Sequence, residues 1–246
     1  KRYTFFLSFF ISLTFSNDLE VKPIVFTLHS SNGSDWVYEK TPLTSFGAGL
    51  SFKFQNPTWS VLVDYIQLGF IGQINHSLYS FSSIKSLPYL DKSKDADGYW
   101  SEYVETKIAY KLKSAEIYLG IFDRNVGYGV NSIHISKKSP SFPQIGFNWQ
   151  IKKNLNFIYF HGFLNSGVND SSRSAFYENE ISQRIIDVPR NVAYHRLEWR
   201  PINNFVLGLN ESVIYSLRNL DFHYLIPVAP FYPIENYLGD TDNIQM

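Results

Sequence analysis

The sequence predicts an all-β fold, an antiparallel transmembrane β-barrel. Apolar side chains recur at every second position over segments of about ten residues, which is the length of a membrane-crossing strand. Short turns alternate with long polar loops along the chain, and the N-terminus resembles a secretion signal. Because successive side chains of a strand point to opposite faces, each segment has one apolar wall and one polar wall.

The composition narrows the classes of protein. The 246 residues carry a formal net charge of zero, which removes the electrostatic argument for a nucleic-acid partner. Aromatic residues make up 17% of the chain, which suits a membrane barrel with aromatic girdles and also a soluble β-sandwich. The mean hydropathy of −0.17 is too polar for a helical membrane protein. The absence of cysteine excludes disulfides, thiol catalysis and cysteine-based zinc sites.

Residues 1–17 are predicted to be a signal peptide. A basic start at Lys1 and Arg2 precedes a mostly apolar run from Tyr3 to Phe15. The alternative is an ordinary first strand or helix. Residues 18–246 are predicted to form one β-barrel domain. Since the chain lacks an initiator methionine and ends without a terminal strand pattern, we expect a fragment of a larger barrel, truncated at the C-terminus.

Alternating segments predict the strands in order. They lie near residues 19–28, 45–55, 58–70, 99–112, 115–123, 144–151, 154–164, 191–201 and 204–216. Tight turns are expected at Asn56-Pro57, Lys113-Ser114, Lys152-Lys153 and residues 201–204.

Three longer segments separate these hairpins. Residues 85–98 and 165–190 are polar loops, the second with a short helix expected over Ala175 to Ile185, and residues 221–242 are rich in proline. Outer-membrane barrels join their strands by tight turns at one rim and by longer loops at the other.

The strand at 191–201 carries an unusual set of charges. One face holds Tyr194, Arg196, Glu198 and Arg200. The other face holds Ala193, His195, Leu197 and Trp199. Charges of alternating sign would be costly toward lipid, so they must face a lumen or water. Such a ladder can line a polar pore or bind an anionic sugar through the paired donors of arginine, or it can cross-link the inner wall of a barrel through ion pairs.

Other candidate ligand-binding residues are scattered. Glu211 interrupts an apolar face, which predicts a position near a rim or a β-bulge. Arg124 lies in a turn with charges of both signs, and Tyr128 follows in a Gly-Tyr-Gly string where its ring can stack on a sugar.

The sequence predicts no enzyme and no cofactor. The six histidines never have i, i+4 or H-x-H spacing, so no metal site is expected. No G-x-S-x-G motif indicates a hydrolase nucleophile.

Three groups of strings, from about residue 120 to the end, resemble a known family. The first group joins Gly127-Tyr128-Gly129 and Ile135-Ser136 to Pro140-Ser141-Phe142-Pro143. The second joins His195-Arg196-Leu197-Glu198-Trp199-Arg200-Pro201 to Leu207-Gly208-Leu209-Asn210-Glu211. The third joins Tyr224-Leu225-Ile226-Pro227 to Gly239-Asp240-Thr241-Asp242-Asn243. They resemble stretches of the Wzi-like capsule-assembly outer-membrane proteins, which more often have Gly-Pro-Gly at the first string and run well beyond Asn243.

The resemblance implies a non-enzymatic, lectin-like barrel in the cell outer membrane of a Gram-negative bacterium. It would be a monomer that contacts outer-membrane lipid, binds capsular polysaccharide and helps to organise the capsule. The candidate ligand-binding residues are then Arg124, Tyr128, Arg196, Glu198, Arg200, Glu211, Asp242 and Asn243. A general porin of the same architecture is the first alternative, and a secreted carbohydrate-binding β-sandwich is the second.

Overall fold

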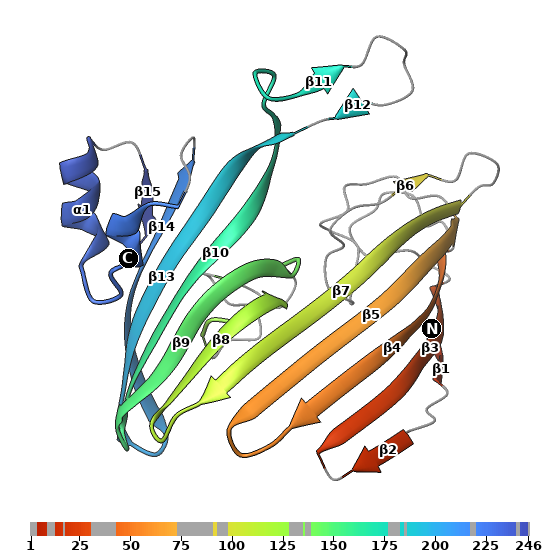
Figure 1. The fold of residues 1–246 in the computed structure, drawn as a ribbon, viewed down its shortest axis with the longest axis horizontal. Coiled ribbons are helices and arrows are strands. Elements are labelled where there is room, and N and C mark those ends of the chain that lie inside the picture. Colours follow the sequence, from red (N-terminus) through yellow and green to blue (C-terminus); the bar gives the residue numbers. More distant parts are fainter. Residues whose placement is uncertain are drawn as a thin grey trace. The chain divides into compact units, whose positions relative to one another are not determined.

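The chain folds into long antiparallel strands, which form two compact units (Figure 1). Lys1–Tyr110 and Gly120–Ser141 make up the first unit, and Lys111–Leu119 and Phe142–Met246 the second. The computed structural model describes residues 4–8, 13–16, 18–30, 43–72, 91–92, 98–127, 135, 139–176, 183–184, 186–216, 220–239 and 242–245.

Seven strands begin in the first unit. They are β1 (Thr4–Ser8), β2 (Leu13–Ser16), β3 (Leu19–Ser30), β4 (Leu43–Gln55), β5 (Trp59–Gly72), β6 (Asp91–Lys92) and β7 (Gly98–Lys111). The hydrogen-bonded order is β1-β3-β4-β5-β7, with β2 on β3 and β6 on β7. The turn between β4 and β5 forms as expected, because the Asn56 side chain accepts the N–H groups of Thr58 and Trp59 at 2.8 and 2.6 Å.

The second unit continues the antiparallel pattern from β8 (Ala115–Phe122), whose last residues belong to the first unit. Its further strands are β9 (Phe142–Lys152), β10 (Leu155–Asn169), β13 (Asp187–Ile202), β14 (Phe205–Ser216) and β15 (Asn243–Gln245), in the order β8-β9-β10-β13-β14-β15. A separate pair, β11 (Ala175–Phe176) and β12 (Gln183–Arg184), lies in the long loop. Two short helices, η1 (Phe222–Leu225) and α1 (Phe231–Leu238), precede β15.

The all-β prediction is confirmed, and each of the nine expected strands is present within a few residues of its predicted ends. The pairings end at β1 on one side and at β15 on the other, so closure into a barrel stays a prediction. Residues 4–8 and 13–16 form strands paired with β3, and their role as a signal peptide stays a prediction as well. Neither described helix has the length and apolarity that crossing a membrane requires.

One local expectation is wrong. The helix expected over Ala175 to Ile185 is absent from its described residues, because Ala175 and Phe176 pair as a strand with Arg184 and Gln183. The proline-rich segment, to which the sequence pattern assigns no element, contains α1. Its Pro233 falls in the first helical turn, where a missing N–H breaks no helical hydrogen bond, and Gly239 ends the helix at a φ of 94°.

The faces of the strands have an inverted polarity in the second unit. The apolar face of β13 and β14 exposes Leu197, Trp199, Leu207 and Leu209, and Leu209 is 68% exposed. On the opposite face the charged side chains of Arg196 and Glu198 are buried, with exposures of 8% and 7%. A water-soluble protein buries its apolar face and exposes its charges, so these positions have the reverse arrangement, although Phe160, Val192 and Tyr194 are buried on the same face as Arg196.

The first unit repeats this arrangement on its apolar face. The register places the exposed Leu50 beside Tyr65, and Tyr65 beside Val104, across β4, β5 and β7. Further exposed side chains of the same face are Val25, Phe46, Phe52, Trp59, Val63, Ile71, Trp100 and Ile108. The opposite face carries Lys22, Lys53, Asp64, Glu105 and Lys107 among apolar and small residues.

One cluster of buried apolar residues lies in the second unit, where η1 and α1 cover part of the apolar face. Tyr224 and Phe231 pack there against the sheet residues Tyr159, Ala193, Val213 and Tyr215. The Tyr159 hydroxyl donates to the Tyr224 carbonyl at 2.9 Å, which fixes η1 on β10. The helical segment therefore covers one part of this face and leaves Trp199, Leu207 and Leu209 exposed.

Candidate functional site

The candidate site is centred on an ion pair within one strand, β13. Residues two apart on a strand share a face, and Arg196 Nε lies 2.9 Å from Glu198 Oε1. Their side chains are only 10% and 9% exposed. Burying a charge is costly unless it is paired, so these two residues depend on each other.

Amide side chains surround this pair on neighbouring strands. The register sets Asn156 of β10 beside Glu198, and Asn210 of β14 beside Arg196. One strand further, Gln150 lies beside Asn156, and Asn148 of β9 lies beside Ile158. Adjacent strands are about 4.8 Å apart, so these side chains form one continuous surface. We call it the polar face, and its residues are Asn148, Gln150, Asn156, Arg196, Glu198, Arg200 and Asn210.

Gly208 makes room for the arginine. It pairs with Glu198 in the register, and a Cβ atom added to Gly208 would lie 2.5 Å from Nη2 and 2.7 Å from Cζ of Arg196. The guanidinium therefore lies across the bare backbone of β14. Glycine at this position allows the arginine side chain to approach the backbone closely, and it is not required for a flexible backbone.

Arg200 extends the ladder toward the turn between β13 and β14. Its Nη2 lies 3.6 Å from Glu198 Oε2, and its side chain is 47% exposed. Glu198 is thus flanked by two guanidinium groups of different exposure. The buried guanidinium of Arg196 is held in the ion pair with Glu198, whereas the half-exposed guanidinium of Arg200 presents its donors to solvent.

This arrangement can bind an anionic, hydroxyl-rich ligand. Arg200 offers paired N–H donors that match a carboxylate, and the amides of Asn148, Asn156 and Asn210 both donate to and accept from hydroxyl groups. Among the residues that the structure describes, no group of three or more His, Asp or Glu side chains could hold a metal ion.

Glu211 lies on the opposite, apolar face and is not part of this surface. The pairing of β13 with β14 is regular from Arg190 to Trp199, so the β-bulge considered for Glu211 is wrong. Its Oε2 accepts from the Phe231 backbone N–H at 3.0 Å and lies 2.9 Å from His195 Nε2. These partners satisfy the carboxylate where the sequence shows an interrupted apolar strand.

His195 joins the covering segment to the sheet. Its Nδ1 lies 3.0 Å from the Pro227 carbonyl oxygen, and its ring stacks on Phe231 with centroids 4.4 Å apart. The pair His195–Glu211 therefore acts as an anchor for residues 227–231.

Asp242 and Asn243 also belong to this anchored region. The Tyr224 hydroxyl donates to Asp242 Oδ2 at 2.8 Å, and Asn243 pairs with Ile214 at the start of β15. Arg124 lies in the first unit, where its guanidinium is 5.5 Å from the centre of the Phe122 ring. Tyr128 lies outside the described residues.

The structure thus brings together Arg196, Glu198 and Arg200 of the predicted residues and adds the four amides to them. The amides come from three other strands, and their own strand patterns mark them only as polar. The positions of the tight turns and the alternation together determine the register of each hairpin. This register is the sequence signal that could have identified the amides.

Comparisons with known proteins add no relative: no family model, no curated protein and no solved structure matches this chain.

Replacing Glu198 by alanine tests the ion pair. Glu198→Ala leaves the guanidinium of Arg196 buried without its carboxylate, and we expect a loss of about 3 kcal/mol in the free energy of unfolding. Arg200→Ala is the matched control and should cost less than about 1 kcal/mol, since Arg200 is half-exposed. Urea titration of the folded protein in detergent measures both. Equal losses in the two variants would contradict the account.

Proposed function

We propose that this chain is a transmembrane β-barrel protein of the outer-membrane type that binds acidic surface polysaccharide. The inverted polarity of its strands is the observation that carries the membrane part. Large apolar side chains are exposed at alternate positions on one face, while Arg196 and Glu198 are buried on the other. In a bilayer the exposed apolar face contacts lipid, and the polar face lines a lumen.

The height of the apolar face supports the same proposal. On β5 its exposed apolar side chains extend from Trp59 to Ile71, interrupted by Gln67, which pairs with Glu102 of β7. This span is about 40 Å along the strand at about 3.3 Å per residue. For the strand tilt of about 40° found in membrane barrels, the height is about 30 Å, which is close to the thickness of the hydrocarbon core of a bilayer. Near the turn end, the rings of Trp59 and Tyr110 pack edge to face 4.7 Å apart, as in an aromatic girdle.

The ligand part rests on the polar face and on the resemblance to the Wzi-like family. The ligands of that family are capsular polysaccharides, which are glycans at the cell surface. An acidic sugar in such a glycan offers carboxylates and hydroxyl groups to the protein. Arg200 supplies an exposed cation for the first, and the surrounding amides supply donors and acceptors for the second. A soluble β-sandwich would instead need Trp199 and Leu209 in its core, whereas both are exposed.

Arginine substitutions on the two faces test membrane insertion. Leu209→Arg places a charge on the apolar face and should cost about 2–4 kcal/mol of folding free energy near the bilayer midplane. Asn148→Arg, at an exposed position of the polar face that pairs with Ile158, should fold into vesicles with a yield close to that of the parent. Heat-modifiable migration on gels reports the folded fraction. Equal yields for the two variants would contradict the membrane proposal.

Co-sedimentation with polymers tests the ligand. We expect the protein in vesicles to bind alginate, a polymer of uronic acids, more tightly than the neutral polymer dextran. Arg200→Ala removes a charge-assisted pair and should weaken alginate binding about tenfold. Arg173→Ala, in the exposed turn after β10, is the control and should have no effect. Ion conductance across planar bilayers without any preference for alginate would contradict binding and favour a porin.

A further inference from the structure

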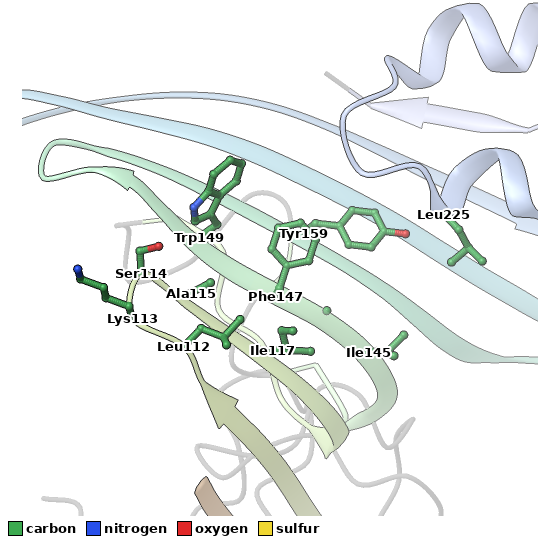
Figure 2. A pocket seen from close by; sticks show the side chains of 11 residues that line it. Leu112, Lys113, Ser114, Ala115, Ile117, Ile145, Phe147, Trp149, Tyr159 and Leu225 are labelled. Atoms are coloured by element: carbon green, nitrogen blue, oxygen red, sulfur yellow. The ribbon is translucent and has the colours of Figure 1, made fainter. Parts of the chain in front are cut away.

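A groove on the apolar face of the second unit ends at a cluster of lysines. Figure 2 shows the side chains that line it, which come from β8, β9, β10 and η1. Its volume is about 650 Å³, and its apolar lining includes Ile117, Ile145, Phe147, Trp149 and Leu225. A volume of this size is typical of a site for a small ligand, since such sites measure about 300–1,000 Å³.

The groove exists because η1 adds a wall to the sheet. Ile117 and Ile145 lie on the exposed face of β8 and β9, and they alone would make a flat surface. The hydrogen bond of Tyr159 to the Tyr224 carbonyl holds η1 in place, and Leu225 follows directly. In Figure 2 Leu225 and Lys113 lie at opposite ends of the set of lining residues.

The turn at the end of the groove and the next turn of the sheet together carry three lysines. Lys113 is itself a lining residue, in the turn between β7 and β8. The Gln150 N–H donates to the Ser114 carbonyl at 2.7 Å, so this turn lies beside the end of β9. Lys152 and Lys153 follow at the next turn, and all three lysines are exposed. Neither turn contains an acidic residue, whereas the turn after β4, Asn56-Pro57-Thr58, contains no cation.

We infer that this groove binds one anionic phospholipid, with an acyl chain along the apolar lining and the phosphate at Lys113, Lys152 and Lys153. The inference rests on the proposed membrane insertion. Short turns of outer-membrane barrels lie at the periplasmic side, where the headgroups of the inner leaflet would meet these lysines. Lysines at a membrane surface attract anionic lipid. Tryptophan, the residue type of Trp149, is enriched at the level of the lipid headgroups.

An ordinary lipid-facing surface would not select one lipid. Here the wall formed by Leu225 adds contact along the acyl chain, and Lys113, the charged residue among the lining residues, lies at the opposite end from Leu225 (Figure 2). The two features together match an amphiphile that has one anionic head and one long apolar tail. A peptide would also need partners for its backbone groups, and the lining offers few polar atoms.

Native mass spectrometry of the full chain, released from nanodiscs, tests the inference. The nanodiscs contain equal amounts of phosphatidylglycerol and phosphatidylcholine. We expect one retained phosphatidylglycerol per protein, preferred over phosphatidylcholine by at least about tenfold. The triple variant Lys113→Ala, Lys152→Ala, Lys153→Ala should lose this preference. Ala115→Trp fills the groove and should release the lipid although the lysines remain.

Leu209→Trp is the matched control, because it adds the same ring to the apolar face outside the groove. It should retain the phosphatidylglycerol. Heat-modifiable migration of each variant separates the two proposals. A parent protein that folds into nanodiscs but binds both lipids equally overturns the lipid site and leaves the membrane proposal standing. A parent protein that does not insert overturns both.

Discussion

Alternation with a period of two determines most of what this molecule can do. A shift of one residue in the register of β13 would place Leu197 and Trp199 on the face that now holds Arg196 and Glu198. The charges would then lie on the exposed apolar face, and large apolar side chains would crowd the glycine that accommodates the guanidinium. The buried ion pair and the exposed apolar face are therefore two consequences of one register.

The apolar face is not uniform, and its exceptions explain the helical segment. His195 and Glu211 lie opposite each other there, and a bilayer would not accept them uncovered. Residues 227–231 cover them with a carbonyl, a backbone N–H and an aromatic ring. Leu225, just before this segment, lines the groove, so the chain that covers two polar side chains also forms a wall of the groove.

Sequence reasoning could predict the strands, their turns and the face of each charge, because all of these depend on neighbours within one hairpin. It could not predict the partners of Glu211, since Phe231 lies 20 residues further along the chain. Phe231 also begins a helix with prolines at its start, where the sequence pattern does not indicate a helix. The amides of the polar face were missed for a related reason. Asn210 lies beside Arg196 within one hairpin, but Asn156 comes beside Glu198 only through the pairing of β10 with β13, which a long loop separates along the chain.

Spin-label accessibility along β14 tests the inverted polarity most directly. The chain contains no cysteine, so single cysteines can be introduced and labelled without a background. In vesicles the account predicts that labels at residues 205, 207 and 209 collide mainly with lipid-soluble oxygen. Labels at residues 206, 210 and 212 should collide mainly with a water-soluble nickel chelate. The account would be contradicted if labels at all six positions had the same relative accessibility to oxygen and to the chelate. It would also be contradicted if labels at the odd-numbered positions collided mainly with the chelate.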